Sequence, residues 1–160
     1  MKLTVDIQTA SREPVPAGAD LRRWVTAALA GRTTQQQVEI SVRLVDTEEM
    51  TQLNTGYRGK EGPTNVLSFP ADLPPELGLP LLGDIVICAP VVAAEAAQQG
   101  KSATAHWAHM TVHGTLHLLG YDHIEEEDAQ IMEALESAIL RQLDYSCPYE
   151  NHLSHEQISQ

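Results

Sequence analysis

Three histidines around a short helix and a glycine are the feature that most restricts how this chain can fold. The run His113-Gly-Thr-Leu-His117-Leu-Leu-Gly-Tyr-Asp-His123 places histidines at positions i, i+4 and i+10. At about 3.6 residues per turn, His113 and His117 project from one face of a helix, one turn apart. Gly120 can adopt a left-handed conformation and end that helix, as glycine often does just beyond a helix C-terminus. The chain can then turn back and bring His123 to the same point in space.

Three imidazoles that converge from one side leave a fourth coordination position free, which is the ligand set of a catalytic zinc ion. Such an ion lowers the pKa of its bound water to about 7 and polarises carbonyl or phosphoryl oxygens. The spacing HxxxHxxGxxH also matches metzincin proteases, in which a glutamate after the first histidine is the general base. Here that position is Gly114, which has no side chain to accept a proton, so peptide hydrolysis by that mechanism is not expected. We predict one zinc ion per chain, held by His113, His117 and His123.

Two further histidines and an aspartate lie close enough in sequence to contribute to the site. His109 is one turn before the histidine motif and His106 is on the adjacent turn. Each is either an additional ligand or a packed, hydrogen-bonded helix residue. Asp122 adjoins the third histidine, where it could support that ligand or cap the following helix. His152 and His155 lie near the C-terminus and are expected to be exposed to solvent.

Alternating strand and helix patterns predict an α/β fold. We expect strands at 3–8, 38–45, 64–69 and 82–88, and helices at 20–30, 47–57, 89–100, 102–117 and 125–143. Right-handed crossovers would make the first, second and fourth strands parallel, with the third antiparallel at an edge beside the histidine helix. The predicted architecture is a single-domain sandwich with a mixed four-stranded sheet (three parallel strands, one antiparallel edge strand) and about five helices. It would occupy 1–150 as a metal-dependent hydrolase domain, with a flexible tail at 151–160.

Apolar stripes predict which side of the first and last helices faces the core. Asp20 is expected to be the N-cap of the first helix. The apolar stripe of that helix consists of Leu21, Trp24, Val25, Ala28 and Leu29. Acids at 125–128 suit the N-terminal turn of the last helix, because the helix dipole favours negative charge there. The stripe predicted for the last helix consists of Ile131, Leu135, Ile139, Leu140 and Leu143.

The net charge of −12 is unevenly distributed, which leaves a nucleic-acid partner open. From residue 121 onward there are ten acids and one base, hence −9, whereas 1–120 hold twelve acids and nine bases, hence −3. Phosphates are normally met by Lys and Arg, so RNA would have to contact a local basic patch, and the acidic C-terminal third should face elsewhere. Arg58 and Lys60 form a basic cluster on a glycine-containing loop. A guanidinium suits a phosphate oxygen, although a solvated loop has the same composition.

The N-terminus and the cysteines favour a cytoplasmic location. Residues 1–7 alternate like a strand and lack the apolar core of a signal peptide. No apolar run approaches the roughly 20 residues that span a bilayer. Cys88 and Cys147 have no CxxC spacing and are expected to be reduced. We expect neither a membrane partner nor DNA.

Three motifs together resemble one known family. They are Tyr57-Arg58-Gly59-Lys60 with Pro63-Thr64-Asn65-Val66-Leu67-Ser68-Phe69-Pro70, then Leu82-Gly83-Asp84-Ile85-Val86-Ile87-Cys88, and last His106-Trp107-Ala108-His109 followed by the histidine motif. In this order and spacing the chain resembles the YbeY family of bacterial rRNA-maturation endoribonucleases. The histidine motif with glycine at its second position is the most specific of the three.

The resemblance implies what the histidines and the basic loop do. It implies zinc on the three histidines of the motif and a single-strand-specific endoribonuclease, acting in small-subunit rRNA 3′-end maturation and ribosome quality control. Arg58 and His113 would be catalytic, and RNA would meet the face carrying Arg58 and Lys60, with Arg43 as a further candidate. The implied partners are single-stranded RNA, rRNA, and the small ribosomal subunit with its associated proteins.

Two alternatives remain open at this stage. One is a zinc hydrolase of another substrate class, such as a protease or an amidohydrolase. The other is a non-catalytic RNA-binding ribosome-assembly factor with a structural zinc ion. A fourth protein ligand such as His109 would favour the structural role, because closed four-ligand sites are typical of structural zinc.

Overall fold

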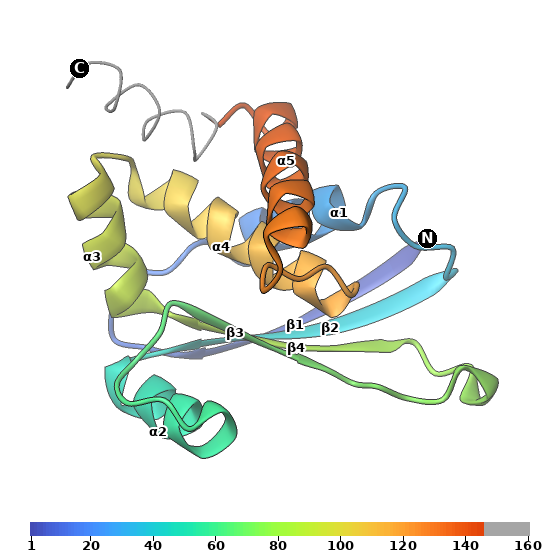
Figure 1. The fold of residues 1–160 in the computed structure, drawn as a ribbon, viewed down its shortest axis with the longest axis horizontal. Coiled ribbons are helices and arrows are strands. Elements are labelled where there is room, and N and C mark those ends of the chain that lie inside the picture. The colour runs from blue at the N-terminus through green and yellow to red at the C-terminus, as the bar shows by residue number, and fades with distance from the viewer. Residues whose placement is uncertain (146–160) are drawn as a thin grey trace.

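The computed structural model describes residues 1–145 and shows helices packed on one four-stranded sheet (Figure 1). The strands are β1 (Lys2–Ala10), β2 (Gln37–Val45), β3 (Val66–Pro70) and β4 (Leu81–Cys88). The helices are α1 (Gly18–Leu29), α2 (Thr47–Arg58), α3 (Ala89–Gln99), α4 (Ala103–Leu118) and α5 (Glu126–Gln142), with a 3-10 turn at Pro75–Leu77. The predicted tail, the predicted boundary at residue 150, and the predictions for Cys147, His152 and His155 lie outside the described residues.

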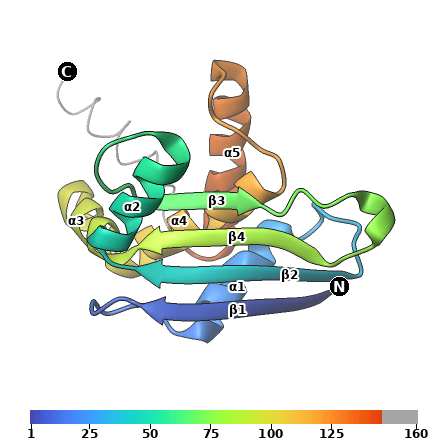
Figure 2. The same ribbon diagram turned by 90° about the horizontal axis from the view of Figure 1, so that it is seen from below.

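The sheet is mixed, as the crossover argument predicts. Its strand order is β1-β2-β4-β3 (Figure 2). β1 pairs parallel with β2, with Val5 opposite Ile40, and β2 pairs parallel with β4, with Val42 opposite Ile85. β3 runs antiparallel to β4 at the edge, where Ser68 lies opposite Ile85. The predicted fold class is therefore confirmed.

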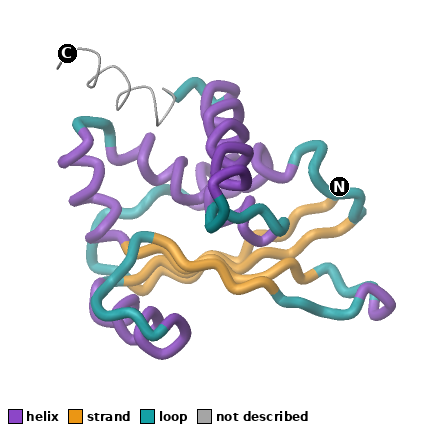
Figure 3. The backbone as a smooth tube through the Cα atoms, in the orientation of Figure 1, coloured by secondary structure: helices purple, strands orange, loops and turns teal. Residues whose placement is uncertain are grey.

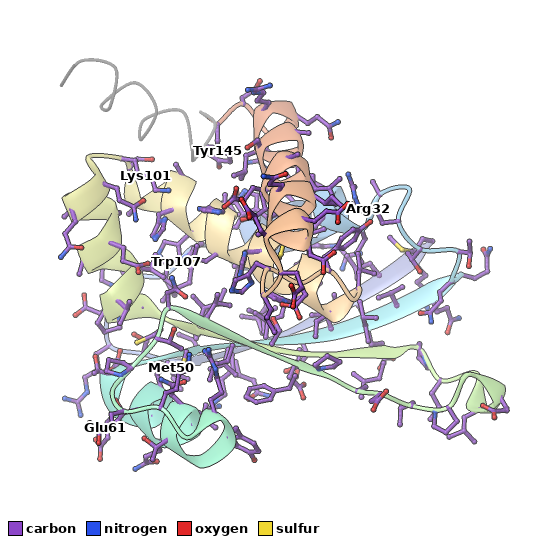
Figure 4. The ribbon with its side chains drawn as sticks, viewed as in Figure 1. Arg32, Met50, Glu61, Lys101, Trp107 and Tyr145 are labelled. Atoms are coloured by element: carbon purple, nitrogen blue, oxygen red, sulfur yellow. The ribbon has the colours of Figure 1, made fainter. Side chains whose placement is uncertain are left out.

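The helices form layers on the two sides of the sheet. α1, α4 and α5 lie on one side and α2 lies on the other (Figures 1 and 3). All five apolar residues predicted for the face of α1 are fully buried in the main core. Met50 lies between α2 and the sheet, fully buried, in a second and smaller cluster (Figure 4). No helix within residues 1–145 is both long and apolar enough to cross a membrane.

The start of α1 differs from the prediction. The helix begins at Gly18 with Ala17 at the N-cap, so Asp20 lies in the first turn instead of capping it. The backbone N–H of Asp20 already donates to the Ala17 carbonyl oxygen, at 3.0 Å. An acid in the first turn still interacts favourably with the helix dipole, which explains the residue type at this position.

The buried side of α5 differs from the predicted stripe at one residue. Ile131 is 49% exposed, so its predicted place in the core is wrong. The buried residues of this helix are Met132, Glu136, Ile139 and Leu140. Of the predicted stripe, Ile139 and Leu140 are fully buried and Leu135 and Leu143 are partly buried against the core, so the prediction is wrong at Ile131 alone, and Met132 is buried in its place.

α4 lies directly against the sheet at Gly114. A Cβ at this position would lie 2.9 Å from Ile85 Cγ2 and 3.3 Å from both Ser68 Oγ and Val66 Cγ2. The Ser68 hydroxyl also donates a hydrogen bond to the Gly114 carbonyl oxygen, at 2.9 Å. Because glycine has no side chain, the helix can lie directly against β3 and β4. This contact sets the position of the neighbouring His113 relative to the sheet edge.

Replacing Gly114 by alanine should lower the free energy of unfolding by about 1–3 kcal/mol, the usual effect of overpacking a core contact. Urea denaturation followed by circular dichroism measures this change. Gly56→Ala in α2 is the matched control, because a Cβ there meets nothing within 4 Å. The control should be neutral or stabilise the protein by up to about 1 kcal/mol, since alanine favours a helix over glycine. Because the helix preference of alanine acts in both variants, a Gly114 variant as stable as the Gly56 variant would contradict the close packing of α4.

Candidate metal centre

The three histidines of the motif converge beside β3. Their candidate ligand nitrogens all lie within 4.8 Å of one another. The ring centroids are 4.7 Å apart for His113 and His117, 5.3 Å for His113 and His123, and 5.0 Å for His117 and His123. His117 Nε2 lies 3.1 Å from His123 Nδ1. Two ligands of a tetrahedral metal ion with metal–N distances of about 2.0–2.1 Å, as for zinc, would be about 3.3 Å apart, so the His117–His123 pair has the spacing of two ligands of one ion.

The return of the chain after α4 is built by local hydrogen bonds. Gly120 has a φ of +103°, the left-handed region expected for the residue that ends this helix. The backbone N–H of Tyr121 donates to the Leu116 carbonyl oxygen at 3.1 Å, which closes the turn. Asp122 Oδ1 then accepts from the backbone N–H of His123 at 2.7 Å. Asp122 therefore holds the third histidine's segment and does not cap α5, whose N-cap is residue 125.

A buried carboxylate from α5 lies behind the histidines. Glu136 is 1% exposed, and its Oε1 accepts a hydrogen bond from His109 Nε2 at 2.6 Å and one from His113 Nδ1 at 3.3 Å. Burial would raise the pKa of Glu136, but the hydrogen bonds and positive charge of the two histidines outweigh it and hold this pKa at about 2. Glu136 is therefore a carboxylate at neutral pH. No sequence pattern that we considered had identified it.

His117 is neutral at physiological pH. Its burial, reinforced by repulsion from the charged forms of His113 and His123, lowers its pKa to about 4. Only a neutral imidazole has a lone pair to offer a metal, so a lowered pKa removes the competition of protons for this ligand above about pH 4. Because the three rings cannot all be protonated without repelling one another, the cluster is better suited to binding one metal cation than to binding three protons.

A cleft of about 540 Å³ opens over the histidines. One wall is formed by residues 64–68, which lead into β3 and include its first half, and Arg58 lies at the same opening, at the end of α2. Within residues 1–145 no carboxylate forms an ion pair with Arg58. The cleft therefore combines a candidate metal site with a guanidinium whose charge is not neutralised by a salt bridge.

The two upstream histidines, His106 and His109, each form a hydrogen bond with a glutamate near the site. His106 is 2% exposed, and its Nε2 bonds to Glu95 Oε1 at 2.8 Å. Glu95 also accepts from Asn65 Nδ2 at 3.1 Å, which ties α3 and α4 to the start of β3. His109 contacts Glu136 as described above. Among the described residues the metal-ligand cluster contains neither histidine, which favours the packed, hydrogen-bonded interpretation for both.

The predicted basic residues are not all at the cleft. Lys60 lies on the loop beyond α2 and is not among the residues that line the cleft, so its role in binding RNA stays a prediction. Arg43 donates from Nε and Nη2 to the two carboxylate oxygens of Glu49, at 2.6 and 2.9 Å. This pairing neutralises the charge of Arg43 and makes it a weaker candidate for a phosphate contact.

The acidic C-terminal third does not face away from the cleft over its whole length. Asp122 and Ile124 both line the cleft, together with the third histidine. The prediction that the acidic C-terminal third faces away from the RNA-binding face is therefore wrong for the first residues of this segment, 122–124. The physical reason is the turn at Gly120, since a chain that returns His123 to the metal site also brings its neighbours there.

Comparison with known proteins identifies the family. The family model described as Endoribonuclease YbeY matches residues 6–144. The chain belongs to the YbeY family. A protein named Endoribonuclease YbeY from Stutzerimonas stutzeri is 55% identical over 148 residues, which cover 92% of this chain and 91% of the relative. Another of the same name, from Cellvibrio japonicus, is 50% identical over 149 residues, covering 93% of this chain and 83% of the relative.

The YbeY resemblance inferred from the motifs is thus confirmed, and a solved structure supports the fold. The solution structure of TM1509 from Thermotoga maritima matches with a TM-score of 0.57 and covers 93% of both chains. At 23% identity this similarity shows the shared architecture alone. The comparison with this structure therefore assigns no roles to individual residues, and the roles proposed below are argued from the geometry of the metal centre.

Proposed function

We propose that this chain is a zinc-dependent, single-strand-specific endoribonuclease. It acts in small-subunit rRNA 3′-end maturation and ribosome quality control, in the cytoplasm, with single-stranded RNA and the small ribosomal subunit with its associated proteins as partners. The observation that carries the proposal is one cleft holding both three convergent histidines and Arg58. Membership of the YbeY family, whose relatives are named endoribonucleases, supports RNA as the substrate.

The chain's own residues have distinct roles in this function. His113, His117 and His123 would hold one zinc ion, which when bound supplies a Lewis acid and makes water a nucleophile at neutral pH. Arg58 binds a phosphate oxygen with its planar guanidinium and stabilises the negative charge that grows on the phosphoryl oxygens during displacement. Lys60 adds positive charge beside the path of the RNA backbone.

The packing of α4 argues against a peptidase of the metzincin type. In metzincins the position of Gly114 carries the glutamate that acts as general base. Here even a Cβ at that position would lie 2.9 Å from Ile85 Cγ2, so a longer side chain has no room to reach the metal site. A peptidase of that type would need a different α4 contact.

Metal removal tests the proposed function directly. Full-length protein stripped by a chelator should cleave labelled single-stranded RNA at least about 100-fold more slowly, since a catalytic metal supplies several kcal/mol of transition-state stabilisation. Stoichiometric zinc should restore the rate, and the same RNA annealed to its complement should resist cleavage. Initial rates on denaturing gels measure both effects.

Each alternative predicts a different result in the same assay. Unchanged cleavage after complete metal removal would refute zinc dependence. Zinc-loaded protein that binds RNA without cutting it, and whose melting temperature falls on chelation, would support the non-catalytic assembly factor. Metal-dependent turnover of a peptide panel without RNA cleavage would support a hydrolase of another substrate class.

A further inference from the structure

The carboxylate of Glu136 connects two histidines of α4 from a different helix. A single oxygen, Oε1, lies 2.6 Å from His109 Nε2 and 3.3 Å from His113 Nδ1. Glu136 is 1% exposed, and α5 directs it toward α4 from a position that would otherwise belong to the apolar stripe. A buried charge is unfavourable unless it is paired and hydrogen-bonded, so this arrangement needs both histidine contacts.

The direction of the hydrogen bonds determines which nitrogen of His113 carries the proton. A carboxylate has acceptor sites only, so each histidine must donate an N–H to it. In His113 the donor is Nδ1, which leaves the lone pair on Nε2. Nε2 is then the nitrogen that His113 offers to the cluster it shares with His117 and His123.

We propose that Glu136 is a positioning residue for the metal centre. It keeps His113 in the Nδ1–H tautomer and holds the plane of its ring, so that Nε2 is aligned with the other two ligands before a metal binds. His109 shares the carboxylate and fixes its orientation, although His109 itself is outside the ligand cluster. This inference rests on the proposed zinc site and adds the residue that orients one of its ligands.

Glu136→Gln is the variant that tests this role with the least change in shape. The single amide oxygen of glutamine could still accept from both histidines, as Oε1 does, but it carries no negative charge, so both hydrogen bonds become weaker and the ring of His113 is held less firmly. We expect the zinc affinity of the full-length chain to fall about 10- to 100-fold, the usual effect of mutating a hydrogen-bond partner of a metal-bound histidine. Competition with a chromophoric chelator measures the dissociation constant.

Glu133→Gln is the matched control. Glu133 is exposed on the same helix, so this variant makes the same change in charge without touching the histidines. Its zinc affinity should equal that of the wild type. Circular dichroism at the temperature of the titration checks that each variant is folded.

A second measurement observes the tautomer of His113 directly, first in the wild-type chain and then in the variant. Long-range ¹H–¹⁵N correlation spectra of the zinc-loaded wild-type chain should show His113 bound through Nε2, with a slowly exchanging proton on Nδ1. In the Glu136→Gln variant that proton should exchange faster with water. A purely structural role of Glu136 in joining α4 and α5 would alter the melting temperature without changing the ligating nitrogen or the exchange rate.

The outcomes separate this inference from the proposed function. If the wild type binds no zinc, the metal centre is refuted and the role of Glu136 with it. If the wild type and the Gln variant bind zinc equally well, or if His113 ligates through Nδ1, only the positioning role is overturned. A loss of affinity in Glu136→Gln but not in Glu133→Gln, with Nε2 ligation in the wild type, supports both.

Discussion

Replacing His113 by alanine is expected to prevent stable zinc binding and to lower RNA cleavage at least about 100-fold. The variant removes one of three imidazoles whose ligand nitrogens lie within 4.8 Å of one another. Two histidines alone would hold zinc more weakly and would leave its position undetermined relative to Arg58. Zinc content per chain after dialysis and the initial rate on fluorescent single-stranded RNA measure the two effects.

His106→Gln is the control for changing a histidine of the same helix. His106 hydrogen-bonds to Glu95 through Nε2, and the amide of glutamine retains an N–H donor for this contact. The control should keep one zinc ion per chain and close to wild-type cleavage. Wild-type activity of the His113 variant, in a preparation free of contaminating nucleases, would contradict the assignment of the catalytic centre.

The sheet could be predicted because its determinants are local or follow from general rules. Strand and helix patterns alternate clearly, and right-handed crossovers then require β1, β2 and β4 to be parallel. The face of α1 was also predictable, since five apolar residues recur at helical spacing. Its first residue was not, because Ala17 forms no side-chain cap and therefore leaves no signal in the sequence.

The candidate site also has a part that the sequence predicts and a part that it does not. A histidine pair one turn apart and a glycine turn are local features, so the convergence of His113, His117 and His123 followed from spacing. Glu136 is 23 residues beyond His113, and its contact depends on the angle at which α5 crosses α4. No periodicity in either helix encodes that angle. The available signal was an acid four residues after Met132 in the buried stripe, and assigning the stripe to Ile131 concealed it.

Replacing Arg58 by glutamate is expected to lower kcat/KM for single-stranded RNA at least about 100-fold, the usual effect of removing one donor that stabilises transition-state charge. Arg58 lines the cleft of the three histidines and forms no ion pair within residues 1–145, so its charge is available to a phosphate. Zinc content should be unchanged, because Arg58 is not a ligand. The separation of activity from metal content distinguishes this variant from His113→Ala.

Two further variants test whether the loss of activity in Arg58→Glu comes from the geometry of the guanidinium or from the change in net charge. Arg58→Lys keeps the charge but loses the planar pair of donors, so its activity should lie between those of the wild type and Arg58→Glu. Arg22→Glu makes the same change in net charge at an exposed position of α1 that does not line the cleft. If Arg22→Glu lowered kcat/KM as much as Arg58→Glu, general electrostatic attraction would explain the effect. A loss confined to position 58 would instead support a direct contact between the guanidinium and a phosphate in the cleft that it shares with the three histidines.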